Sequence, residues 1–243
     1  RRVLFRSRNY ISHIFVVKRS LLDEVGMLSS DYDGSQDYDL ILRCTERAKN
    51  IVHIPRVLYH WRAAAASTAD DPGTKTYAYE AGRRAVETFL RDRGRPEIGV
   101  ESTEAFPTMY RLRIPIKGNP SVRVILRPGK DEQRVPERLE ALKSQTAWKQ
   151  VSWQVLKGDG TRGEAFRQAA EAAAEDYLVF LDGIPEALNP DWIREMLQWA
   201  QEERIGAVGA KIRLAGSTDL RHAGIILHRP RLRLGSRRLQ IGR

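Results

Sequence analysis

The sequence predicts an α/β fold, and two observations support this prediction. In residues 120–240, short apolar runs alternate with segments of helical pattern, at an interval typical of a parallel sheet with helical connections. In residues 8–94, an acidic turn leads into an amphipathic helix between two segments of strand character. The chain has 243 residues, of which 42% are hydrophobic, so it is long enough to bury a core as one or two domains.

The expected elements follow one another in three stretches of the chain. In residues 8–94 we expect a strand over 9–17, a helix over 19–26 that ends at a glycine, a helix from near 38 to about 50, a strand over 53–62, a loop over 63–72 and a helix over 77–93. Residues 95–119 contain prolines and a glycine but no helical periodicity, which predicts a linker with one strand over 110–116. In residues 120–240 we expect strands over 122–126, 151–156 and 177–181, with helices over 135–145 and 163–174.

The acidic turn, residues 34–40 (GSQDYDL), carries two carboxylates at the start of the predicted helix. Asp37 and Asp39 are two positions apart and cannot share a helix face, so we expect them to have different roles. Ser35 or Asp37 could cap the first backbone amides, but a carboxylate at this place could also act as a base. The inward-facing stripe of the helix is expected to consist of Leu40, Ile41 and Cys44.

In order and spacing, these segments resemble the inverting family-two glycosyltransferases with the GT-A fold, such as bacterial enzymes that build O-antigen and other surface polysaccharides. The resemblance rests on residues 9–17, 19–26, 36–39 and 53–62, and later on 176–182, 188–193, 206–211 and 222–224. It implies a Rossmann-like GT-A fold in two partial domains. Residues 8–94 would be the acceptor-side half of one domain, and residues 120–240 the donor-side half of the next.

The resemblance also implies roles for the first group of site residues. Asp37 falls on the position of the catalytic base, and a carboxylate within about 3 Å of a sugar hydroxyl can take its proton as the new bond forms. Asp39, His60 and Arg62 would contact the acceptor or the diphosphate. A structural position beside Trp61 is an equal alternative for His60, and a surface ion pair is one for Arg62.

Two other side-chain types have simpler interpretations. His13 and His53 lack a partner at metal-ligand spacing, which favours structural roles for both. Cys44 is the single cysteine and lies on the apolar side of its helix, so we expect a buried thiol.

The second partial domain departs from the family pattern. Where the family has an acidic motif whose last aspartate binds a divalent metal, this chain reads Asp182, Gly183, Ile184, and isoleucine cannot coordinate a hard cation. Asp159 lies near the position of an aspartate that contacts the nucleotide base, but in a different register. We therefore expect a degenerate donor site at Asp159 and Asp182, and assign no metal ligand. Water-mediated metal binding and capping of the next turn both remain open for Asp182.

The expected function is that of a fragment of a tandem glycosyltransferase, with Asp37 as general base and a hexosyl or deoxyhexosyl group transferred with inversion. The donor would be a nucleotide sugar, and the acceptor a glycan or lipid-linked glycan. Mg²⁺ or Mn²⁺ is expected for the intact first domain but not to bind well in this fragment, which we expect to be inactive alone. The alternative is a non-catalytic glycan or polyanion binding module on a retired glycosyltransferase scaffold.

Composition bears on partners and location. The net charge of +10 suits anionic partners and peripheral contact with an acidic membrane face. The basic residues 229–243 lack aromatic interleaving and any DNA-binding motif, so no nucleic acid is expected. The single cysteine and the lack of an apolar run of roughly 20 residues fit the cytoplasm or the inner face of the membrane.

Both ends of the chain look foreign to the protein. Residues 1–7 (RRVLFRS) look like the translation of a sequencing adapter, and residues 241–243 look like adapter read-through. We expect neither stretch to contribute to the fold.

Overall fold

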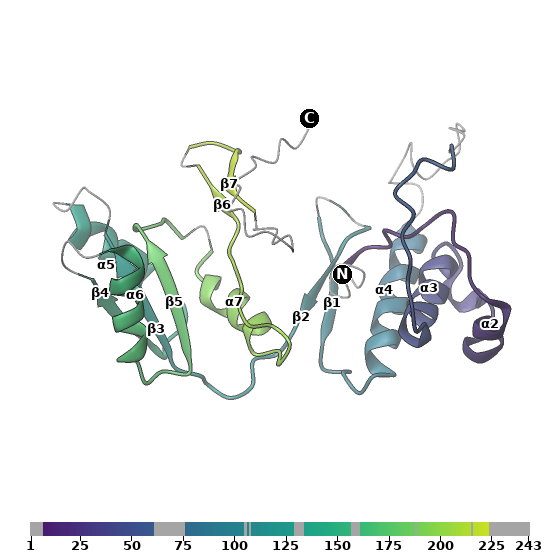
Figure 1. Cartoon of the computed structure of the whole chain (residues 1–243), viewed down its shortest axis with the longest axis horizontal. Coiled ribbons are helices and arrows are strands. Elements are labelled where there is room, and N and C mark those ends of the chain that lie inside the picture. The colour runs from purple at the N-terminus through teal and green to yellow at the C-terminus, as the bar shows by residue number, and fades with distance from the viewer. Residues whose placement is uncertain are drawn as a thin grey trace. The chain divides into compact units, whose positions relative to one another are not determined.

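The computed structural model describes residues 7–60, 76–104, 106, 108–128, 134–156, 161–187, 189–214 and 216–223. The chain divides into two compact units, Arg1–Pro115 and Ile116–Arg243 (Figure 1). The division falls within the segment that was expected to be a linker, residues 95–119. Both units combine helices with strands, and the second contains a parallel sheet, so the predicted α/β class is confirmed.

The first unit is mainly helical. Its elements are α2 (Arg19–Val25), the 3₁₀ turn η1 (Ser30–Tyr32), α3 (Gln36–Arg47) and α4 (Thr76–Arg91). Helix α3 contacts both α2 and α4. The fully buried side chains between α3 and α4 include Ile41, Leu42, Ala85, Val86 and Leu90. The three predicted helices are therefore present, although α3 begins earlier and ends earlier than the sequence indicated.

A two-stranded antiparallel sheet completes the first unit. Strand β1 (Gly99–Ser102) pairs with β2 (Tyr110–Arg113), and β1 contacts α4. The hydroxyl of Tyr110 donates to the carbonyl of Tyr79 on α4 at 2.9 Å. Part of the expected linker thus belongs to this unit. Strand β1 was missed because four residues with one buried side chain give almost no periodicity.

Two predicted strands do not form. Residues 9–17 and 53–60 have no strand hydrogen bonding, and residues 61–62 lie outside the described ranges. Several apolar side chains of these segments are largely exposed, including Val16 at 88%, Val57 at 82% and Leu58 at 64%. The two strand predictions are therefore wrong. Both segments have a composition that favours strands, but a strand also needs a neighbour to pair its backbone groups. Neither segment pairs with another among the described residues of the first unit.

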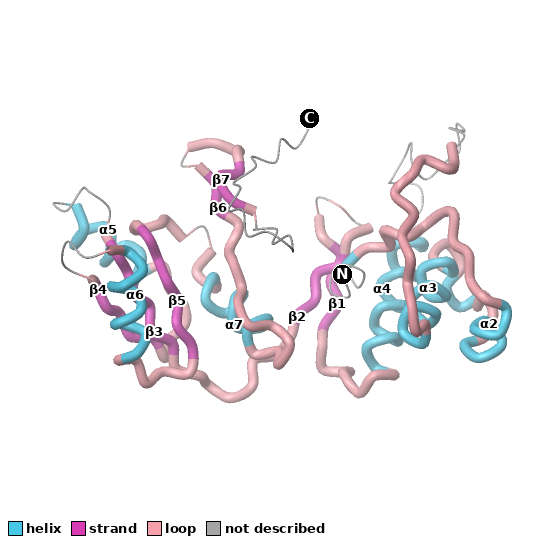
Figure 2. The backbone as a smooth tube through the Cα atoms, in the orientation of Figure 1, coloured by secondary structure: helices cyan, strands magenta, loops and turns pink. Residues whose placement is uncertain are grey.

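The second unit is built on a three-stranded parallel sheet in the order β4-β3-β5 (Figure 2). Strand β3 (Val122–Arg127) lies between β4 (Val151–Val155) and β5 (Tyr177–Asp182), and Val122 is in register with both Val151 and Tyr177. The helices are α5 (Val135–Ser144), α6 (Arg162–Glu171) and α7 (Trp192–Ala200). A short antiparallel ribbon follows, formed by β6 (Ile212–Arg213) and β7 (Leu220–His222).

The core of the second unit lies around β3, whose apolar side chains are completely buried, as expected of a central parallel strand. Val122 and Val124 pack with Ile193 and Leu197 of α7. Further along the strand, Leu126 packs with Leu142 of α5 and with Ile184. The predicted strands and helices of residues 120–181 are thus confirmed, with small shifts at their ends. In the described part of the chain, no helix has the length and apolar character that a membrane span requires.

Candidate functional site

The acidic turn is fixed by contacts to α4 and not by a helix cap. Gly34 adopts a φ of 90°, which brings the chain into the start of α3. Ser35 is the N-cap residue, but its hydroxyl makes no cap hydrogen bond and donates instead to the carbonyl of Ala78 at 2.7 Å. The capping interpretation of Ser35 is therefore wrong, and the hydroxyl ties the turn to the neighbouring helix.

Asp37 lies in the first turn of α3 and is half-buried. Its Oδ2 accepts a hydrogen bond of 2.9 Å from Nδ2 of Asn9, a residue 28 positions earlier. The Oδ1 atom of the same Asn9 accepts a hydrogen bond from the backbone amide of Ser12 at 3.1 Å. The carboxylate is thus bonded to a side chain of another segment and not to the backbone amides of its own helix.

Asp37 borders an open cavity of about 330 Å³ in the first unit. Two parts of the chain form most of its lining. One part contributes Ser12, His13, Ile14 and Phe15, and the first half of α3 contributes Asp37, Leu40 and Ile41. Leu28 and Tyr59 complete the lining. Most of the lining is apolar or aromatic, and a few polar groups, one of them a carboxylate, interrupt it. This is the usual composition of a small-molecule site, where apolar walls bind the body of a ligand and polar groups orient it.

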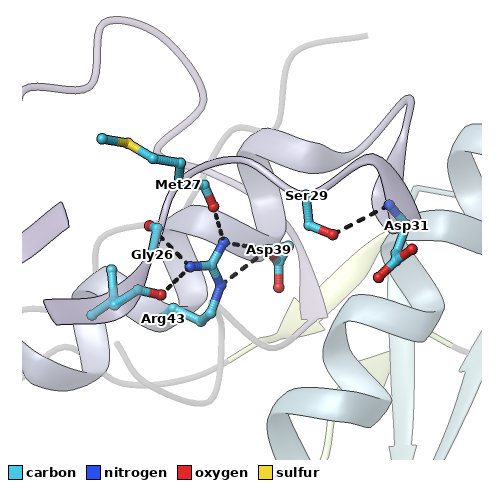
Figure 3. A network of polar contacts seen from close by, with 7 residues as sticks. Gly26, Met27, Ser29, Asp31, Asp39 and Arg43 are labelled. Carbon is cyan, nitrogen blue, oxygen red and sulfur yellow. Dashed lines mark hydrogen bonds and ion pairs between the residues drawn. The ribbon is translucent and has the colours of Figure 1, made fainter. Parts of the chain in front are cut away.

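Asp39 has a different environment from Asp37, as the spacing of the two residues predicted. Its side chain is only 8% exposed, and Oδ2 accepts hydrogen bonds from Nε and Nη2 of Arg43 at 3.0 and 2.6 Å. The guanidinium of Arg43 also donates to the carbonyls of Val25, Gly26 and Met27 at the end of α2 (Figure 3). Asp39 thus orients an arginine that joins α2 to α3, and it does not line the cavity.

The other residues of the first unit that the sequence analysis discussed have different surroundings. His60 is exposed next to the cavity residue Tyr59, and Arg62 lies outside the described residues. His13, for which a structural role was expected, lines the cavity together with Asp37. Cys44 is a free, buried cysteine as predicted, and burial raises the pKa of its thiol.

In the second unit, one residue of the expected donor site, Asp182, lies among the described residues. Asp182 is exposed at the end of β5, and its Oδ1 lies 3.5 Å from Nη1 of Arg127 at the end of β3. Ile184 is 7% exposed and belongs to the apolar cluster with Leu126 and Leu142. Asp159 lies outside the described residues.

The described residues do not fit the Mg²⁺ or Mn²⁺ that the resemblance implies. Within the described ranges, no group of three or more His, Cys, Asp or Glu side chains is arranged to hold a metal ion. A hard cation requires oxygen ligands, and Ile184, which the resemblance matches to a metal-binding aspartate, is buried and apolar.

Sequence reasoning missed Asn9, Ser12 and the tyrosine of the cavity. A hydrogen bond between residues 28 positions apart leaves no periodic signal in the sequence. The adjacency of residues 9–15 to the acidic turn depends on an irregular path of the chain, which propensity does not predict.

The chain is similar in sequence to two much longer proteins. It is 32% identical over 251 residues to "O-antigen biosynthesis protein RfbC" of Myxococcus xanthus, an alignment that covers 92% of this chain and 19% of that protein. It is also 32% identical over 251 residues to "Uncharacterized protein y4gI" of Sinorhizobium fredii, covering 90% of this chain and 27% of that protein. The chain thus spans about a fifth to a quarter of the length of these relatives. No family model and no solved structure matches it.

Proposed function

We propose that the cavity beside Asp37 is the acceptor side of an inverting sugar-transfer site, and that Asp37 is its general base. The observation that carries the proposal is the position of this carboxylate: it is half-buried in the first turn of α3, free of the role of a backbone cap, and on the border of a largely apolar cavity. The apolar and aromatic walls, including Phe15 and Tyr59, suit the less polar face of a sugar ring.

In the proposed reaction, an acceptor hydroxyl in the cavity gives its proton to the Asp37 carboxylate. The acceptor oxygen forms a bond to the anomeric carbon of the donor sugar, while the bond from that carbon to the diphosphate oxygen breaks. The electron pair of the broken bond leaves with the nucleoside diphosphate, and attack from the opposite face inverts the anomeric centre.

The similarity to a protein named for O-antigen biosynthesis supports a role in glycan synthesis. The order of the segments around Asp37 supports the finer assignment to a GT-A glycosyltransferase that uses a nucleotide sugar. The donor half of this site would be supplied by residues other than those described in the first unit.

The test is sugar transfer by the gene product that contains these 243 residues, supplied with a panel of nucleotide sugars and with lipid-linked and free glycan acceptors. We expect Asp37→Asn to lower kcat by roughly 10²- to 10⁴-fold, the usual contribution of general base catalysis, with little change in the KM of the donor. Asp33→Asn, which changes an exposed carboxylate directly before the acidic turn, is the matched control and should leave kcat unchanged. Full activity of Asp37→Asn with normal folding would refute the proposal.

For the second unit, the observations favour the alternative function of a non-catalytic module. Ile184 is buried and Asp182 lies beside Arg127, so that the end of the sheet presents an ion pair in place of a metal site. We expect nucleotide sugars to bind this unit weakly and without dependence on Mn²⁺. Titration of the chain with a nucleotide sugar, with and without Mn²⁺, measures this, and tight metal-dependent binding would contradict it.

A further inference from the structure

We infer that Asn9 is a positioning residue for Asp37, an inference that rests on the proposed function of that carboxylate. Asn9 Nδ2 donates to Asp37 Oδ2 at 2.9 Å. Among the described residues, no donor is bonded to the other oxygen, Oδ1. The hydrogen bond from Asn9 therefore holds Oδ2 of Asp37, and Oδ1 remains to accept the proton of the acceptor hydroxyl.

The orientation of the Asn9 side chain follows from its two partners. The carboxylate of Asp37 accepts hydrogen bonds, and the backbone N–H of Ser12 donates one. Only one of the two flipped orientations of the amide satisfies both: the NH₂ group must face Asp37 and the oxygen must face Ser12. The donor to Asp37 is thus itself held in place, which is what a positioning group requires.

The same hydrogen bond joins the two parts of the cavity lining. One part is the segment that follows Asn9, with Ser12 and His13, and the other is the first turn of α3, with Asp37. The side chain of an aspartate on a helix can otherwise take more than one rotamer. Loss of the bond would leave the carboxylate free to rotate and would also loosen the segment opposite it, so a base that must lie within about 3 Å of a hydroxyl would lose its geometry.

The decisive variant is Asn9→Asp, which is nearly isosteric. It keeps an oxygen that accepts from the backbone N–H of Ser12, so it preserves the structural role that Asn9 has through this hydrogen bond. It removes the donor to Asp37 and places a second carboxylate against the first. Asn9→Ala removes both interactions.

We expect Asn9→Asp and Asn9→Ala each to lower kcat by roughly 10- to 100-fold, the effect of one hydrogen bond to a charged group, with the KM of the donor unchanged. In Asn9→Asp alone, two adjacent carboxylates share a proton at low pH. Its kcat should therefore rise with pH over a range in which the kcat of the unmodified protein is constant. If Asn9 only held the backbone amide of Ser12, Asn9→Asp would change neither kcat nor its pH dependence.

Asn50→Asp makes the same chemical change at an exposed position after α3 and should leave kcat and its pH profile unchanged. Thermal unfolding identifies a variant that fails to fold. If Asn9→Ala fails to fold, the kcat and pH profile of Asn9→Asp still test the role of Asn9. Asn9→Asp with unchanged kcat and an unchanged pH profile, beside an inactive Asp37→Asn, would overturn the inference and leave the proposed function standing. An active Asp37→Asn would overturn both.

Discussion

Arg43 Nη2 lies 2.6 Å from Oδ2 of Asp39, and the same guanidinium donates to the carbonyl oxygens of Gly26 and Met27 (Figure 3). It also donates to the carbonyl oxygen of Val25, the last residue of α2, and the last carbonyls of a helix need donors from outside the helix. A single side chain therefore satisfies the end of α2 and anchors the first turn of α3, which carries Asp37. Asp39 does not line the cavity, but through Arg43 it holds the helix turn on which Asp37 lies.

We expect Arg43→Met to destabilise the first unit by about 2 to 3 kcal/mol, because Asp39 would remain buried without its counter-charge and the carbonyls would lose their donor. Methionine keeps an apolar stem of similar length. Hydrogen exchange of the α3 backbone amides measures the change as a local free energy of opening. Arg47→Met is the control: Arg47 is 68% exposed and lies 4.0 Å from Glu24, so we expect less than about 0.5 kcal/mol. Equal effects of the two variants would contradict the role of Arg43.

The glycine of the acidic turn offers a second test. A Cβ at Gly34 would lie 2.7 Å from Cε2 of Tyr77, 2.9 Å from Cβ of Ala78 and 3.0 Å from Cα of Ala78, and the φ of Gly34 is 90°. Gly34→Ala therefore combines backbone strain with a clash against α4. We expect it to destabilise the chain by about 2 to 4 kcal/mol and to lower activity by displacing the helix start.

Gly94→Ala separates these two causes. Gly94 also has a positive φ, 67°, but a Cβ there would meet no atom within 4 Å. This variant should cost about 1 kcal/mol, the contribution of the backbone conformation alone. Urea unfolding compares the two variants, and a cost for Gly34→Ala no greater than that for Gly94→Ala would show that the contact with α4 is not tight.

The local features of both units were largely predictable, and the contacts between distant segments were not. The segment 122–126 (VRVIL) between Pro120 and Pro128 indicates a buried strand, because four of its five residues are apolar and three of them are consecutive. The spacing of Ile41 and Cys44, three residues apart, indicates the buried face of α3, and both side chains are buried. These signals lie within ten residues or fewer, where periodicity is informative.

The irregular segments show why the rest could not be predicted. Residues 9–17 have the composition of a strand, yet they form a loop that provides Asn9 to Asp37 and Ser12 to the cavity. The position of Asp37 at a helix start followed from the sequence, but its partner and its cavity did not. Such contacts join segments that are far apart in the sequence, and the local periodicity of a single sequence does not predict which segments meet.

The carboxylates at the start of β5 make the second unit sensitive to acid. Glu175 accepts a hydrogen bond from Oγ of Ser152 at 2.6 Å and pairs with Nε of Arg123 at 2.8 Å. The hydrogen bond from Ser152, followed by the interaction with Arg123, lowers the pKa of Glu175 from 4.5 to about 2. Hydrogen bonds from Ser121 likewise lower the pKa of Asp176.

Since the folded pKa of Glu175 is depressed, its ionised form stabilises the fold above pH 4.5, and this contribution is lost as the pH falls towards about 2. We expect the unfolding free energy of the second unit to fall through this range. Glu175→Gln should make the decline shallower, and Ser152→Ala should raise the pKa of Glu175 towards its ordinary value. Urea unfolding as a function of pH and an NMR titration of the Glu175 carboxyl measure these effects, and an unchanged decline in Glu175→Gln would contradict them.

The position of Ile184 predicts that the acidic motif cannot be restored by one substitution. Its side chain is 7% exposed among Leu126 and Leu142, and its carbonyl accepts a hydrogen bond of 2.6 Å from Nη2 of Arg138. In Ile184→Asp the new carboxylate would enter an apolar cluster, so we expect destabilisation by about 3 kcal/mol or more and no tight binding of Mn²⁺. Urea unfolding followed by tryptophan fluorescence, together with calorimetric titration of Mn²⁺, measures both.

Ile184→Val gives the size of the packing contribution alone. It removes one methylene from the same cluster without adding charge, and we expect a cost of about 1 kcal/mol. A much larger cost for the aspartate than for the valine would mean that burial of the charge, not loss of volume, prevents a metal site from forming at this end of β5. If Ile184→Asp instead bound Mn²⁺ tightly and kept its stability, the carboxylate would have to turn outward beside Asp182. One substitution would then be enough to create a metal site at this end of β5.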